Sequence, residues 1–124
     1  MNCLRSPFHT LPVAEEMRRA VTGFVACQPT AYRTPPENPD FTASPAFPLE
    51  TGTLLLSRKD MAAYAVQAKN LGVNVVGSCC GSIPVHVREM ARALGKAPLD
   101  PAWRLDYSKP VSAYEYYGPG KAGP

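Results

Sequence analysis

The sequence lacks any long apolar run. Among its 124 residues, no stretch approaches the ~20 apolar residues that a membrane-spanning helix needs. The opening letters MNCLRSPFHT hold no apolar core of the kind found in secretory signal peptides. We therefore expect no membrane partner and a cytoplasmic location. In that reducing compartment the four cysteines favour metal binding or catalysis over disulfide bonds.

Concentrated charge of either sign is also missing. Thirteen Lys and Arg oppose ten Asp and Glu, which gives a net charge of +3, and no run of five like charges occurs. Such mild basicity does not indicate a nucleic-acid partner. Proline, in contrast, is abundant: the 14 prolines gather in TPPENPDFTASPAFP and near the carboxyl terminus, and we interpret those segments as loops.

Helices that alternate with short strands are predicted between the loops. A first helix is expected over residues 10–21, with Thr10 as its cap and Pro12 in its first turn. Ser57 and Asp60 have capping-box spacing and open a second helix, and Pro84 marks the start of a third. Apolar periodicity predicts these buried faces: Leu11, Ala14, Met17 and Val21 in the first helix; Met61, Tyr64, Ala65, Ala68 and Leu71 in the second; Val87, Met90, Ala91 and Leu94 in the third.

The segments FVACQP, residues 24–29, and VNVV, residues 73–76, are short apolar runs that predict buried strands. Fully apolar strands that alternate with helices indicate an α/β fold with a parallel sheet. Two such strands would leave a sheet face and both edges uncovered. We therefore interpret residues 1–95 as part of a larger α/β domain, followed by an irregular Pro- and Tyr-rich tail over residues 96–124.

Three cysteines are expected at the carboxyl ends of parallel strands, where α/β folds place their active sites. Cys79 and Cys80 follow the second strand, with Gly77 and Gly81 freeing the backbone around them. Cys3 holds the corresponding position before the first helix. Three thiolates would suit zinc, and an open fourth position would mark a catalytic site. A zinc ion there would favour the deprotonated form of a substrate thiol, so alkylation of sulfur is the chemistry that the site would suit.

Other interpretations of these residues remain open. Cysteines are common as small core residues, and Cys27 within the first strand is expected to be one. Cys79 and Cys80 could form a strained vicinal disulfide with a redox role. His9 and His86 could act as ligands, but a surface or capping role is expected for each.

Several segments resemble the homocysteine S-methyltransferase family. The run LGVNVVGSCCGSIPVHVREMARAL is similar to that family's closing strand and helix, where Gly-Gly-Cys-Cys-Gly precedes Pro, His and a helix. The run FVACQPTAYRTP resembles the preceding strand of the betaine-dependent branch. The Asn-Cys pair of MNCLRSPFHT is similar to the end of the family's sixth strand, and LDYSKPVSAYEYYGPG is loosely similar to the branch's tail.

The resemblance implies the carboxyl-terminal part of a zinc-dependent (β/α)8 TIM barrel, from the end of strand 6 through helix 8. Its implied activity is methyl transfer to homocysteine, which yields methionine, with betaine as the favoured methyl donor. The family's zinc ligands match Cys3, Cys79 and Cys80, and Asn2 matches the Asn beside the first ligand, where it would orient the loop. Tyr32, on the loop near the metal, is expected to pack rather than to contact the donor.

The chain departs from the family's pattern in two respects. Ser78 replaces the second Gly of Gly-Gly-Cys-Cys-Gly, and the first five strands, which would carry most substrate contacts, have no counterpart. A barrel needs ~250 residues. We therefore expect a fragment that is inactive when isolated, with a homo-oligomer or a complementing N-terminal portion as its macromolecular partner. The alternative is a catalytically inactive α/β fragment or a partner-dependent zinc-binding module.

Overall fold

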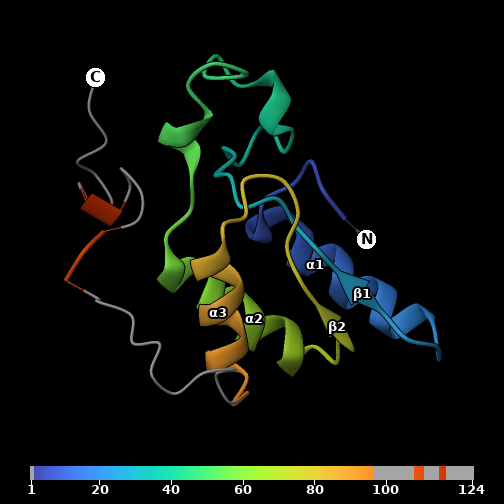
Figure 1. Ribbon diagram of the computed structural model, residues 1–124. Coiled ribbons are helices and arrows are strands. Elements are labelled where there is room, and N and C mark those ends of the chain that lie inside the picture. The colour runs from blue at the N-terminus through green and yellow to red at the C-terminus, as the bar shows by residue number, and fades with distance from the viewer. Residues whose placement is uncertain (1, 97–107, 111–114, 117–124) are drawn as a thin grey trace.

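Helices and short strands alternate along the chain in a computed structural model that describes residues 2–96, 108–110 and 115–116 (Figure 1). Most of the expected irregular tail, residues 96–124, lies outside that range. None of the described helices is long and apolar enough to cross a membrane. In order, the elements are α1 (Pro7–Ala20), β1 (Ala26–Cys27), two 3-10 helices (Phe41–Ala43 and Thr51–Leu54), α2 (Arg58–Asn70), β2 (Val75–Val76) and α3 (Pro84–Ala93).

The two strands form a parallel sheet, which confirms the predicted α/β class. Ala26 pairs with Val75, and Cys27 pairs with Val76. Asn2 adds an isolated parallel bridge to Gln28, so β1 lies between Asn2 and β2. Segments that succeed one another in the chain are therefore neighbours in the sheet, as right-handed crossovers through helices produce.

All three helices pack into one core on a single face of the sheet. Ala14 of α1, Tyr64 of α2 and Met90 of α3 share that core with Cys27 of β1, as predicted for this cysteine. Val75 and its pairing partner Ala26 point to the opposite face, because side chains alternate along a strand. That face is open: Val75 is 53% exposed.

The amino-terminal end of α1 lies earlier than predicted. Ser6 is the N-cap and Pro7 opens the helix, whereas Thr10 lies inside it and donates its hydroxyl proton to the Ser6 carbonyl over 2.9 Å. The prediction placed Pro12 in the first turn because prolines are rare deeper in helices. Here Pro7 takes that place, and Pro12 lies within the helix.

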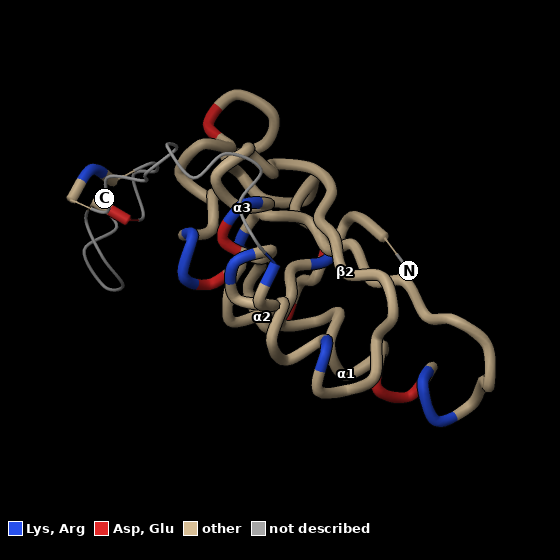
Figure 2. The backbone as a smooth tube through the Cα atoms, turned by 60° about the horizontal axis from the view of Figure 1, so that its bottom comes forward, with Lys and Arg blue, Asp and Glu red and all other residues tan. Residues whose placement is uncertain are grey.

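The predicted apolar face of α1 is only partly covered. Ala14 is buried and Leu11 packs against the core, but Met17 and Val21 are exposed. The helix therefore presents apolar side chains that nothing covers within the described residues. Lys and Arg are interspersed with Asp and Glu along the described chain, in keeping with the dispersed charge of the sequence (Figure 2).

The second helix follows its prediction closely. The Ser57 hydroxyl accepts a hydrogen bond from the Asp60 amide, and the Asp60 carboxylate accepts one from the Ser57 amide, so the capping box is present. Of the five residues predicted for its inner face, Leu71 is half-buried and the other four are fully buried. These four are Met61, Tyr64, Ala65 and Ala68. The buried Tyr64 hydroxyl donates to the Cys27 carbonyl over 2.7 Å, which joins α2 to β1.

The predicted face of the third helix is confirmed in part: Met90 is buried and Leu94 packs against the core, but Val87 is 55% exposed. His86 and Glu89, which the apolar periodicity did not include, are buried as well. His86 is not at the surface, although its expected capping role holds: its Nδ1 accepts from the Ile83 amide at 3.4 Å, and its Nε2 bonds the Leu56 carbonyl at 2.9 Å. These partners satisfy a polar ring that would otherwise be costly to bury.

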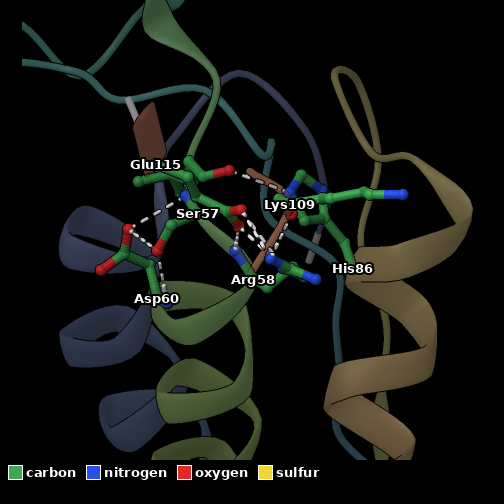
Figure 3. A network of polar contacts seen from close by, with 7 residues as sticks. Ser57, Arg58, Asp60, His86, Lys109 and Glu115 are labelled. Atoms are coloured by element: carbon green, nitrogen blue, oxygen red, sulfur yellow. Dashed lines mark hydrogen bonds and ion pairs between the residues drawn. The ribbon is translucent and has the colours of Figure 1, made fainter. Parts of the chain in front are cut away.

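A buried ion pair joins the start of α2 to the tail (Figure 3). The Arg58 guanidinium lies 3.1 Å from the Glu115 carboxylate, with both side chains at least 90% buried. Arg58 also donates to the Lys109 carbonyl over 2.9 Å, and its backbone amide donates to Glu115. The described tail residues are thus held at the amino-terminal end of α2.

Loss of the Glu115 carboxylate is expected to destabilise the fold. Glu115→Ala leaves the Arg58 charge buried without its carboxylate, a change that typically costs about 3–5 kcal/mol. Urea unfolding followed by circular dichroism measures it, with Glu37→Ala on an exposed loop position as the control. Equal unfolding midpoints for the two variants would contradict the assignment.

His86 is expected to make stability depend on pH. Burial lowers the pKa of His86, and the bond to Leu56 and the charge of Glu115 only partly oppose this shift. The unfolded chain, with a His pKa of about 6.5, therefore binds a proton at higher pH than the folded chain. The free energy of unfolding should fall as pH drops below that value.

Denaturant unfolding at pH 7 and at pH 5.5 measures this dependence. His86→Gln should flatten the difference between the two pH values, and His9→Gln, at the other histidine, should leave it unchanged. A His86→Gln chain with the full pH dependence would show that another group is responsible.

Candidate metal centre

Three thiols meet beyond the carboxyl ends of the strands. The Sγ atoms of Cys3, Cys79 and Cys80 all lie within 4.8 Å of one another. Cys3 follows the Asn2 bridge, and the other two lie between β2 and α3. Among the described residues, these are the His, Cys, Asp and Glu side chains grouped closely enough to hold a metal ion. The structure thus brings together the three residues that the sequence singled out.

Cys3 reaches the cluster through an unusual backbone conformation. Cys3 and Leu4 have φ values of 56° and 62°, in the left-handed region that residues other than glycine seldom occupy. Hydrogen bonds hold this turn: the Cys3 amide donates to the Gln28 carbonyl over 2.9 Å, and the Phe41 amide donates to the Leu4 carbonyl over 3.3 Å. Such conformations persist where the surroundings enforce them, often at functional sites.

The Cys79–Cys80 turn is attached to the segment that follows β1. The Cys79 amide donates to the Pro29 carbonyl over 2.9 Å, and the Ala31 amide donates to the Cys80 carbonyl over 2.7 Å. The Ser78 hydroxyl donates to the same Pro29 carbonyl over 3.2 Å. The serine that departs from the family's glycine therefore adds a bond to the turn.

Two glycines frame this turn for steric reasons. Gly81 has φ +76°, and a Cβ there would lie 2.8 Å from the Tyr32 ring. A Cβ on Gly77 would lie 3.1 Å from the Gln28 side chain. Tyr32 packs with its ring 4.9 Å from that of Phe41, as expected of a packing residue.

Cys3 and Cys80 shift each other's pKa in opposite directions. The Cys3 and Cys80 sulfurs are 3.2 Å apart. Burial acts to raise the pKa of Cys3, but hydrogen bonds from Cys80, Cys79 and nearby backbone together outweigh it and lower the pKa from 9.0 to about 7. The same contact with Cys3, aided by burial, raises the pKa of Cys80 to about 11. Cys3 is therefore the more readily ionised thiol of the pair.

The donor set fits a soft divalent ion. Two sulfurs bound 2.3 Å from a tetrahedral zinc lie roughly 3.8 Å apart, which falls between the 3.2 Å contact and the 4.8 Å limit of the cluster. Thiolate ligands select zinc and similar metals. All four cysteines are free thiols, so Cys79 and Cys80 are not joined by a disulfide.

The remaining candidates have other partners. Cys27 is buried in the core, where burial raises its pKa. The His9 ring bonds the Pro35 carbonyl at 2.9 Å, and His86 bonds the Leu56 carbonyl. Asn2 lies beside Cys3, and its backbone forms the parallel bridge to Gln28.

Comparison with known proteins identifies the family of this chain. Residues 1–94 match the family described as Homocysteine S-methyltransferase. The chain belongs to the homocysteine S-methyltransferase family. It is 33% identical over 100 residues to betaine–homocysteine S-methyltransferase 1 of Mus musculus, which covers 76% of this chain and 25% of that protein. The corresponding protein of Danio rerio is 34% identical over the same shares.

A relative with another methyl donor in its name is similarly close. S-methylmethionine–homocysteine S-methyltransferase BHMT2 of Pongo abelii is 31% identical over 100 residues, which covers 76% of this chain and 28% of that protein. The chain thus spans about a quarter of the length of the curated relatives it matches. Both kinds of relative are named as homocysteine S-methyltransferases, and their names differ in the methyl donor.

The metal ligands are tested by removing one thiol. The purified chain should hold about one zinc per molecule, and Cys80→Ala should lose it, because two thiols complete too little of a tetrahedral site. Zinc is measured by elemental analysis after dialysis. Cys27→Ala, which removes a core thiol outside the cluster, is the control. Undiminished zinc in Cys80→Ala would rule out the three-thiol site.

Proposed function

We propose that this chain is the metal-bearing part of a zinc-dependent enzyme that transfers a methyl group to homocysteine, with betaine as the donor. The observation that carries the proposal is the convergence of three thiols within 4.8 Å in a member of this family. Residues 1–95 would form the barrel from the end of strand 6 through helix 8, and residues 96–124 the tail.

The arrangement of helices and strands supports the barrel. In a (β/α)8 barrel the helices lie outside a parallel sheet, and the active site lies at the carboxyl ends of the strands. Here all three helices pack on one face, and the thiols lie beyond the carboxyl ends of β1 and β2. The opposite face, with Val75, would then line the barrel interior.

Cys3, Cys79 and Cys80 would hold the zinc and leave its fourth position to the substrate. When bound, zinc supplies a Lewis acid that lowers the pKa of the homocysteine thiol. Three anionic ligands would offset the charge of the metal, so the substrate sulfur would keep its nucleophilic character. The lowered pKa of Cys3 favours loading, because its proton leaves more easily when a metal ion binds.

The transfer itself would need no covalent enzyme intermediate. The homocysteine sulfur gives an electron pair to the methyl carbon, and an S–CH3 bond forms as the C–N bond of betaine breaks. The nitrogen keeps the electron pair of that bond and leaves as a tertiary amine. The thiol proton goes to solvent when the sulfur ionises. The contribution of the protein is to bring the reactants into line, which accounts for much of such a rate enhancement.

The second candidate is a partner-dependent module that is inactive alone. Its support is a set of apolar side chains that are exposed within the described residues: Phe24 is 90% exposed and Val75 53%, with Met17 and Val21 also exposed. A partner surface would bury such side chains. An N-terminal portion of the barrel, in the same polypeptide or in another, would cover them, and so would a second copy of the chain.

Substrate binding is tested on the cobalt-loaded chain. Homocysteine should change the cobalt absorption spectrum, because a fourth sulfur enters the metal's coordination shell. Homoserine, with oxygen in place of sulfur, is the matched control and should leave the spectrum unaltered. A chain that holds cobalt but ignores homocysteine would count against the proposed reaction.

Turnover is expected to depend on the rest of the barrel. The isolated chain with zinc, homocysteine and betaine should form no methionine, because it lacks most of the walls that would align the donor. Co-expression with the first five βα units of a betaine-dependent relative should restore methionine formation, measured by mass spectrometry. S-methylmethionine in place of betaine identifies the donor. Full activity of the isolated chain would contradict the partner-dependent interpretation.

A further inference from the structure

Residues 28–32 lie between the two halves of the thiol cluster. On one side, the Gln28 carbonyl accepts from the Cys3 amide over 2.9 Å, and the Thr30 amide donates to the Arg5 carbonyl over 3.0 Å. On the other side, this segment bonds both Cys79 and Cys80 through its backbone. The relative position of Cys3 and the Cys79–Cys80 pair is therefore set through this one segment.

The side chain of Thr30 also bonds the Cys79–Cys80 turn. It is fully buried, and its hydroxyl donates to the Cys80 carbonyl over 2.9 Å. The same oxygen accepts from the Tyr32 amide at 3.4 Å. The Cys80 carbonyl thus receives two hydrogen bonds, from the Thr30 hydroxyl and from the Ala31 amide, although Cys80 itself is exposed.

These contacts fix a thiol that nothing else encloses among the described residues. An exposed cysteine beside the flexible backbone of Gly81 would otherwise sample several orientations. A hydroxyl buried without a partner is unfavourable, so the bond to the Cys80 carbonyl favours this orientation of Thr30. The two hydrogen bonds to one carbonyl oxygen in turn restrain the backbone from which the Cys80 side chain extends.

We propose that Thr30 is a positioning residue for the metal centre, acting through the backbone of Cys80. The inference rests on the proposed metal site. Thr30 is not one of its three ligands, but it would help to set their geometry. Groups that orient ligands typically contribute 10–100-fold to metal affinity. Thr30 would contribute by pre-arranging Cys80, so that less ordering is needed when the ion binds.

The test compares variants that change one hydroxyl. Thr30→Val keeps the shape of the side chain and removes the bond to Cys80, while the Ala31 amide still satisfies the carbonyl. Thr30→Ser restores the hydroxyl. The matched control is Tyr64→Phe, which removes another buried hydroxyl that donates to a cysteine carbonyl, that of the core residue Cys27.

Two readouts separate positioning from stability. Zinc affinity is measured by competition with a chromogenic chelator, and the cobalt spectrum reports the geometry of the thiolate ligands. Thr30→Val should bind zinc about 10-fold more weakly and shift the cobalt bands. Thr30→Ser should restore both values, and Tyr64→Phe should leave both unchanged even where it lowers the unfolding midpoint.

The outcomes distinguish this inference from the proposed function. Wild-type affinity and spectrum in Thr30→Val would overturn the role of Thr30 and leave the metal site intact. An equal loss in Tyr64→Phe would also overturn it, because the effect would then be one of general stability. An unsubstituted chain that binds neither zinc nor cobalt would overturn the metal site itself.

Discussion

The parallel pairing of β1 with β2 is the constraint on which the rest of the structure depends. The pairing comprises two residue pairs. Beyond them, the Gly77 amide donates to the Cys27 carbonyl and the Cys79 amide donates to the Pro29 carbonyl, so the two segments stay side by side after the strands end. Because the strands run in the same direction, the loops after them emerge at the same edge of the sheet. The thiols of Cys79 and Cys80 therefore lie at the same edge as the thiol of Cys3.

One-sided burial is a consequence of the same sheet. The helices bury Cys27 and Val76 from one side, while Ala26 and Val75 face the other way. A parallel sheet is normally covered on both faces or closed into a barrel, and neither occurs within the described residues. In the proposed barrel, this core would form part of the wall, and the side of the sheet that carries Val75 would face the interior.

Features that depend on local chemistry could be predicted from the sequence, and features that depend on distant partners could not. Ser57 and Asp60 are three residues apart, so their spacing alone indicates the capping box. The three thiols were identified from their places beside a strand and a helix and from the family resemblance, and their convergence agrees with that interpretation. His86 is buried because the Leu56 carbonyl, on another segment, satisfies its ring. Thr30 carries no sequence signal for its contact, since its hydroxyl meets the Cys80 carbonyl only in the folded chain.

A metal ion would add a direct connection between the thiols to the backbone bonds that already link their segments. The sheet has two paired residues in each strand, and the sulfurs of Cys3 and Cys80 lie 3.2 Å apart. An ion bound to Cys3, Cys79 and Cys80 would join the start of the described chain to the loop before α3. Ions that bind the folded state alone stabilise it by mass action. Metal binding and folding of this segment would therefore be coupled, and the geometry that Thr30 supports would affect both.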